Sequence, residues 1–197
     1  MSTFTRRLVY LYVGLFLFGL SVALLVQARL GLAPWDVFHQ GLSDRTGIPI
    51  GTVGIFVGVV VLLLWIPLGQ RPGLGTVSNV IIVGLVIDGV LLVLPEPDPM
   101  AARVSFMVGA ILLNAVATAL YIGARLGPGP RDGLMTGLAA KGYSVRVART
   151  VIELSVLTLG WLLGGTVGVG TALYALCIGP LVHVLLPRLT VADKVSA

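Results

Sequence analysis

Long apolar runs are the feature that most constrains how this chain can fold. Six segments each hold roughly 20 mainly apolar residues, enough for a helix to cross the hydrocarbon core of a bilayer with its backbone groups bonded internally. They are residues 8–28, 50–68, 76–94, 104–124, 147–163 and 171–186. Charged residues make up only 11% of the chain, too few to cover a water-facing surface. The sequence therefore predicts an all-α membrane protein with six transmembrane helices.

Two further segments, residues 34–45 and 130–142, are helix-like but too short and too polar to span a membrane. We expect a short helix in each. The sequence leaves open whether these helices lie flat at the interface or are re-entrant. It also predicts that His39 is a wetted surface residue.

The basic residues predict the orientation. If the N-terminus is cytoplasmic, ten basic residues are cytoplasmic: Arg6, Arg7, Arg71, Arg125, Arg131, Lys141, Arg146, Arg149, Arg188 and Lys194. Only Arg29, Arg45 and Arg103 fall outside. This bias predicts that both termini are cytoplasmic. It also accounts for the net charge of +5 without a nucleic-acid partner.

An internal repeat indicates a duplication. The segment ARLGLAPWD from Ala28 returns as ARLGPGPRD from Ala124, and eight of 15 positions in this window match at a spacing of 96 residues. The same spacing pairs Trp65 with Trp161. One deleted residue later, GLGT from Gly73 matches GVGT from Gly168, and Gly84 matches Gly179. Residues 1–99 and 100–197 are thus predicted to be equivalent halves.

Each predicted half contains three spans and one short helix. Because three is an odd number, the second half must enter the membrane inverted, as in many secondary transporters. We expect Trp35 on the outer side and its counterpart Arg131 on the inner side, so that the two short helices belong to opposite sides.

The repeated Arg-Leu-Gly-x-x-Pro-x-Asp element has two interpretations. In the structural one, Arg29 and Arg125 suit the negative end of a helix, and Asp36 and Asp132 suit the first turn of the next. In the functional one, two short helices aim their N-termini at a central pathway. These four residues are therefore candidate pathway residues.

Four more candidates lie within the predicted spans. Ionisable groups are costly there, so Asp88, Glu153 and His183 should face the bundle interior or a cavity. Asp88 and His183 are repeat equivalents. Glu153 can contact His183 or pair with Arg149 along one helix face. Asn114 is either a pore-lining group or an interhelical hydrogen-bonding group.

Several kinds of chemistry lack a sequence signal. The chain has no Walker-type phosphate loop, no Gly-x-Ser-x-Gly element and no His-Glu-x-x-His element. Its single cysteine, Cys177, excludes an intrachain disulfide. We therefore expect neither enzyme activity, nor a cofactor, nor a metal site.

Three segments carry a family resemblance: GLAPWDVFHQGL at residues 31–42, GIPIGT at 47–52 and QRPGLGT at 70–76. They resemble the bacterial YczE-like membrane proteins of the wider YczE/YyaS/YitT grouping. The resemblance covers nearly the whole chain and implies a multi-pass protein of the bacterial plasma membrane. It implies no substrate and no catalytic residues.

These patterns favour a small-solute transporter that uses alternating access between inverted halves, with Glu153 or His183 coupling protons. A passive channel and a non-transporting scaffold or regulatory subunit are the alternatives. The expected partners are the lipid bilayer and an unidentified small solute or ion, and the sequence leaves the oligomeric state open, a homodimer included.

Overall fold

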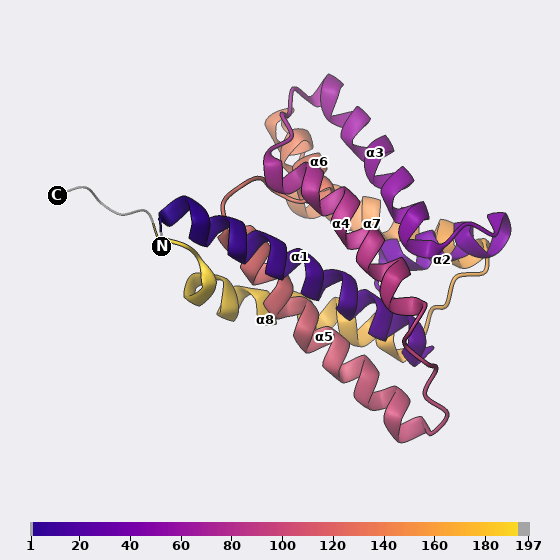
Figure 1. The fold of residues 1–197 in the computed structure, drawn as a ribbon. Helices are drawn as coiled ribbons and strands as arrows, with labels where there is room; N and C mark the ends of the chain where they lie inside the picture. Colours follow the sequence, from indigo (N-terminus) through magenta and orange to yellow (C-terminus); the bar gives the residue numbers. More distant parts are fainter. Residues whose placement is uncertain (1, 193–197) are drawn as a thin grey trace.

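The computed structural model describes residues 2–192, and over that range the chain consists of helices and their links. Figure 1 shows how they are arranged. The helices are α1 (Thr3–Ala28), α2 (Pro34–Thr46), α3 (Ile50–Leu68), α4 (Leu74–Leu91), α5 (Met100–Gly123), α6 (Pro130–Ala140), α7 (Val145–Leu162) and α8 (Val169–Leu189). All eight helices expected from the sequence are present, including the two short ones.

Five of these helices are long and apolar enough to cross a membrane: α1, α3, α4, α5 and α8. The predicted sixth span corresponds to α7, which has 18 residues and includes Arg146, Arg149 and Glu153. With these three charged residues, α7 does not qualify as a candidate span by composition. The structure therefore shows an all-α chain with five candidate spans rather than the predicted six.

The helices form two groups. The first contains α1, α4, α5 and α8: α1 packs against α5 and α4, and α5 also packs against α8. In the second, α2 packs against α7 and α3, while α6 packs against α3 and α7. The contact between α3 and α4 joins the groups. In Figure 1, α4 accordingly lies between α1 and the group that contains α3.

Small residues bring α1 and α5 into close contact at the centre of the first group. A Cβ atom at Gly14 would lie 3.0 Å from the carbonyl oxygen of Ala117. Deeper in the same interface, Asn114 donates to Ser21 Oγ at 2.8 Å and accepts from the Tyr174 hydroxyl at 2.9 Å. This chain of hydrogen bonds ties α1, α5 and α8 together, which is how polar groups stabilise helix contacts in lipid.

The two repeated links dock against the starts of long helices in the opposite half. Gly75 N–H at the start of α4 donates to Leu126 O at 2.8 Å, and Gly170 N–H at the start of α8 donates to Leu30 O at 2.7 Å. A Cβ atom at Gly170 would lie 2.6 Å from the Gly31 carbonyl oxygen, so these contacts require the absence of a side chain. Each half thereby positions a helix of the other.

The links themselves share one backbone conformation. Arg29 and Arg125 have φ values of 52° and 56°, and Gly31 and Gly127 have φ values of 113° and 131°. Left-handed geometry is uncommon for a non-glycine residue, so its recurrence at equivalent positions is a specific structural match. It ends the long helix and turns the chain into the short one.

Asp88 of α4 caps the start of α3. Its carboxylate accepts from Gly51 N–H at 2.7 Å, from Thr52 N–H at 2.8 Å and from the Thr52 hydroxyl at 2.7 Å. These donors would otherwise have no partner in the first turn of α3. The helices touch here, since a Cβ atom at Gly84 would lie 2.5 Å from the Gly51 carbonyl oxygen.

We expect Asp88→Ala to destabilise the protein by about 2 kcal/mol or more, because three hydrogen bonds to a charged acceptor are lost where water is scarce. Asp88→Asn should be milder, since its amide oxygen still accepts. Thermal unfolding in detergent measures the effect, with Asp98→Ala in the exposed α4–α5 link as the matched control. Wild-type stability in Asp88→Ala would contradict the capping role.

Candidate functional site

A cavity of about 450 Å³ lies between the two helix groups, and every helix contributes to its wall. The volume is in the usual range for small-molecule sites. Most of the lining is apolar. The polar side chains that line it are Asp36, His39, Asn79, Thr118, Tyr121, Arg131, Asp132, Arg149, Glu153, Tyr174 and His183.

The N-termini of the short helices α2 and α6 meet at this cavity. Arg131 Nη2 lies 3.6 Å from Asp36 Oδ1, and the Arg131 guanidinium carbon lies 4.9 Å from the centre of the Trp35 ring. Trp35 and Asp36 are 7% and 5% exposed. Helices from both halves therefore converge, and their first turns are in contact, while the sides of the membrane to which α2 and α6 belong stay a prediction.

His39 is buried one turn after Asp36, so the prediction of a wetted surface residue is also wrong. Its Nδ1 atom lies 3.6 Å from Asp36 Oδ1, and its Nε2 atom is buried without a hydrogen-bonding partner among the described residues. The ring lies beside Gly54 of α3, where an added Cβ atom would be in ordinary contact at 3.5 Å from His39 Nδ1. Helical spacing from Asp36 was the sequence signal that could have identified His39.

Asp36 and His39 both have shifted pKa values. Burial alone would raise the pKa of Asp36, but its interaction with His39 and the charge of Arg131 outweigh burial and lower it. Burial lowers the pKa of His39, and the charge of Arg131 adds to this, against the opposing effect of Asp36. Near neutral pH the cavity therefore contains an ionised Asp36 beside a neutral His39.

Asp132 sits on the α6 side of the cavity, where it accepts a hydrogen bond from the Tyr121 hydroxyl at 3.1 Å. The start of α6 is held by Trp65, whose indole N–H donates to Pro130 O at 3.0 Å. Gly133 permits this packing, since a Cβ atom there would overlap the Trp65 ring at 1.9 Å. Trp65 of α3 therefore holds the start of α6 in place.

Glu153 and His183 line the cavity from α7 and α8. Of the two partners proposed from the sequence for Glu153, the structure shows Arg149, whose Nε lies 2.9 Å from Glu153 Oε1. Arg149 lines the cavity as well. The part of the wall formed by α7 and α8 thus carries one carboxylate and two basic side chains.

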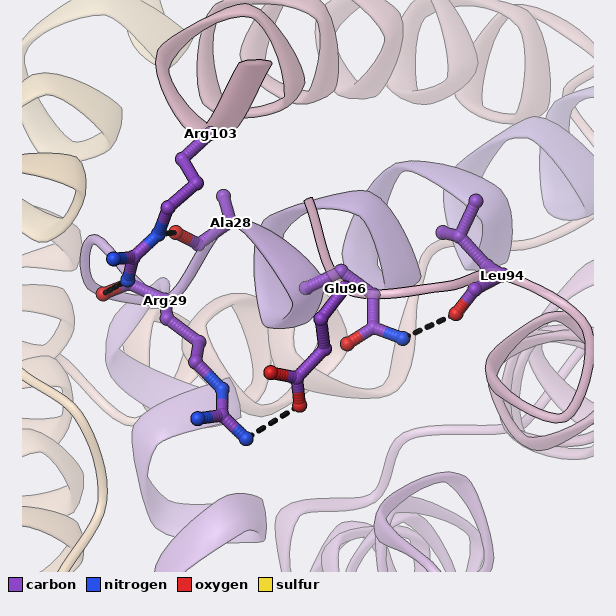
Figure 2. A network of polar contacts seen from close by, with 6 residues as sticks. Ala28, Arg29, Leu94, Glu96 and Arg103 are labelled. Atoms are coloured by element: carbon purple, nitrogen blue, oxygen red, sulfur yellow. Dashed lines mark hydrogen bonds and ion pairs between the residues drawn. The ribbon is translucent and has the colours of Figure 1, made fainter. Parts of the chain in front are cut away.

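Four candidates lie outside the cavity wall. Asp88 caps α3 and Asn114 joins three helices, as described above. Arg29 and Arg125 occupy the links. Figure 2 shows that Arg29 pairs with Glu96, while Arg103 donates to Ala28 O at 2.9 Å and to Arg29 O at 3.0 Å. Arg29 therefore belongs to the closure of the α1 end, which favours its structural interpretation.

The site combines a mostly apolar cavity with a few convergent charged groups, which is the usual composition of a small-molecule site. Within residues 2–192, no cluster of three or more His, Cys, Asp or Glu side chains is suited to hold a metal ion. Lys194, one of the predicted cytoplasmic charges, lies outside the described residues, and Arg131 lies at the cavity instead of in a loop. The orientation stays a prediction.

Comparison with known proteins identifies relatives over most of the chain. It is 40% identical to an uncharacterized protein of Haemophilus influenzae, over 90% of this chain and 84% of that protein. It is 29% identical to the uncharacterized membrane protein YczE of Bacillus subtilis, over 92% of this chain and 86% of that protein, and 27% identical to YyaS of the same organism, over 92% of each chain. No solved structure matches the chain.

The predicted resemblance to YczE and YyaS is confirmed. A family model described as DUF6198, a family of unknown function, matches residues 5–187, and the chain therefore belongs to that family.

Proposed function

We propose that this membrane protein is a small-solute transporter that works by alternating access, with its solute bound in the cavity between the two helix groups. The observation that carries the proposal is an asymmetry between equivalent helix pairs. One pair closes the cavity wall, and its counterpart in the other half leaves the wall open.

The closed pair is α3 and α4. A Cβ atom at Gly51 would lie 2.0 Å from the Gly84 carbonyl oxygen, and one at Gly58 would lie 2.9 Å from Val80 Cγ1. The equivalent helices, α7 and α8, are both fully described and make no comparable contact. Gly179, the counterpart of Gly84, has no described atom of another element within 4 Å of an added Cβ and lines the cavity.

An inverted repeat explains this arrangement. We infer that the two halves form a 3+3 inverted repeat in which α7 is the sixth span and α2 and α6 are re-entrant. The matching left-handed links and the reciprocal docking of α4 and α8 support equivalence of the halves. In such a protein, exchanging the conformations of the halves exchanges the open side for the closed one.

The proposed motion is a rocking of the group α2, α3, α6 and α7 against the group α1, α4, α5 and α8. In the structure described here, the contact is made through α3 and α4. In the alternate state, α7 would close on α8 while α3 leaves α4. With both termini cytoplasmic, the present opening between α7 and α8 faces the cytoplasm.

The cavity residues divide into two proposed roles. Asp36 and Asp132, at the meeting N-termini, flank the solute. Glu153 and His183 lie on the open wall, where a change of water access would accompany rocking, so either can couple proton movement to transport.

The inverted topology predicts that the C-terminal ends of α2 and α6 face opposite sides of the membrane. Asp44→Cys and Lys141→Cys, each in a Cys177→Ser background, place single thiols near these ends. We expect a membrane-impermeant thiol reagent, applied to oriented vesicles, to label Asp44→Cys from the outside and Lys141→Cys only after the cytoplasmic side is exposed. Labelling of both from the same side would refute the inverted repeat.

The rocking motion predicts a reversible lock. Val147 and Gly179 are the counterparts of Gly51 and Gly84, so cysteines at both positions should come within disulfide range in the alternate state. In the Cys177→Ser background, mild oxidation should form this disulfide. It should also stop the saturable uptake, by proteoliposomes, of solutes from a defined mixture of amino acids, amines, carboxylates and sugars measured by mass spectrometry.

Reduction should restore uptake, and the two single-cysteine variants are the controls. A disulfide that forms without slowing uptake would contradict alternating access. Non-saturable flux in the unlocked protein would indicate a channel, and absence of flux for every solute would favour a scaffold.

A further inference from the structure

We propose that the cavity binds a small organic cation, such as an alkylated ammonium or guanidinium compound, at Trp35 and Asp36. In the absence of this solute, the guanidinium of Arg131 occupies the same site. This inference rests on the proposed function, because it names the solute class of the same cavity. Binding can nevertheless be measured without transport.

Arg131 makes the contacts expected of such a bound cation. Its guanidinium lies over the Trp35 ring, with 4.9 Å to the ring centre, and 3.6 Å from the Asp36 carboxylate. An aromatic face beside a carboxylate is the combination that recognises ammonium and guanidinium groups, since the ring quadrupole and the negative charge attract the same cation. Consecutive residues at the start of α2 supply both elements.

The contacts of Arg131 and His39 leave the Asp36 carboxylate without a close hydrogen bond from either side chain. Both Arg131 Nη2 and His39 Nδ1 lie 3.6 Å from Asp36 Oδ1, which is longer than a hydrogen bond. Asp36 is nevertheless 5% exposed, and a buried carboxylate normally has close donors. The site therefore has unused accepting capacity. Asp88, by contrast, accepts three hydrogen bonds of 2.7–2.8 Å.

The charge of the cavity wall also favours a cation. Three carboxylates line it, on Asp36, Asp132 and Glu153, against two guanidinium groups, on Arg131 and Arg149. These five groups together carry one net negative charge, which favours a cation over an anion. The alkyl part of such a solute would find an apolar surface: Phe18, Val57, Val61, Val80, Val83 and Ile87 also line the cavity.

Arg131 has room to move away from Asp36. Its side chain is 33% exposed, whereas that of Asp36 is 7% exposed. A long arginine side chain can rotate into the adjoining cavity of about 450 Å³ while the carboxylate and the ring stay in place. Solute and Arg131 would then compete for Asp36, and removing Arg131 should strengthen solute binding.

The opposing hypothesis is an anion site in which Arg131 is the receptor. The two hypotheses predict opposite effects of the same substitutions. Removing Arg131 should strengthen cation binding but abolish anion binding, and removing the charge of Asp36 should abolish cation binding but strengthen anion binding.

The experiment measures binding of radiolabelled tetraethylammonium to the purified full-length protein in detergent at constant ionic strength. We expect saturable binding to the wild type that methylguanidinium displaces and sodium acetate does not. Arg131→Gln should bind tetraethylammonium at least tenfold more tightly. Asp36→Asn should lose saturable binding, and Trp35→Leu should weaken it several-fold. Arg146→Gln, which removes an arginine that does not line the cavity, is the matched control and should bind like the wild type.

Two results would overturn the inference: no saturable tetraethylammonium binding to the wild type, or equal or weaker binding to Arg131→Gln. Each variant is first checked for a single peak in size-exclusion chromatography. If Asp36→Asn does not fold, the comparison of the wild type with Arg131→Gln still distinguishes the cation site from the anion site. Tetraethylammonium binding without any solute uptake would refute transport and leave the cation site standing, whereas saturable uptake confined to anions would refute the cation site and leave transport standing.

Discussion

Hydrogen bonds between the backbones of the two halves are the interaction on which the rest of this structure depends. In a bilayer, backbone groups at a helix start must find partners within the protein. Here Gly75 at the start of α4 donates to Leu126, and Gly170 at the start of α8 donates to Leu30. Both acceptors lie in the links that lead into the short helices. The same contacts that satisfy α4 and α8 therefore fix where α2 and α6 begin.

The position of the cavity follows from this arrangement. Because α2 and α6 start from opposite links and converge, their first turns meet between the two helix groups, and Arg131 of one half reaches Trp35 and Asp36 of the other. The long helices α1 and α5 pack through Gly14 and Ala117, where there is no room for a solute. The cavity lies where the two groups face each other, and its lining includes the polar side chains described above.

Much of the fold could be predicted because it depends on local patterns. Apolar length predicted the long helices, and Pro34 and Pro130 marked the first residues of the short ones. The 96-residue spacing identified equivalent positions, but it could not show that two equivalent residues, Trp35 and Arg131, are in contact. Equivalence is a property of sequence, whereas contact depends on the direction in which each short helix points after its left-handed link.

The candidate site was harder to predict for the same reason. An ionisable residue in an apolar segment indicates either a structural hydrogen bond or a functional group, and only its partners decide between them. Asp88 accepts three hydrogen bonds and is explained by the start of α3. Asp36 is as deeply buried as a core residue, yet Arg131 and His39 stay beyond hydrogen-bonding distance of its carboxylate.

A buried ion pair adds little stability even when its geometry is good, and apolar residues of similar size would often stabilise the same space better. In a chain with only 11% charged residues, the pair of Asp36 and Arg131 at the cavity therefore has no explanation in folding alone. Charges that stabilise a fold are normally satisfied within it, as Asp88 is. Asp36 and Arg131 are not, and that difference argues for a role in binding.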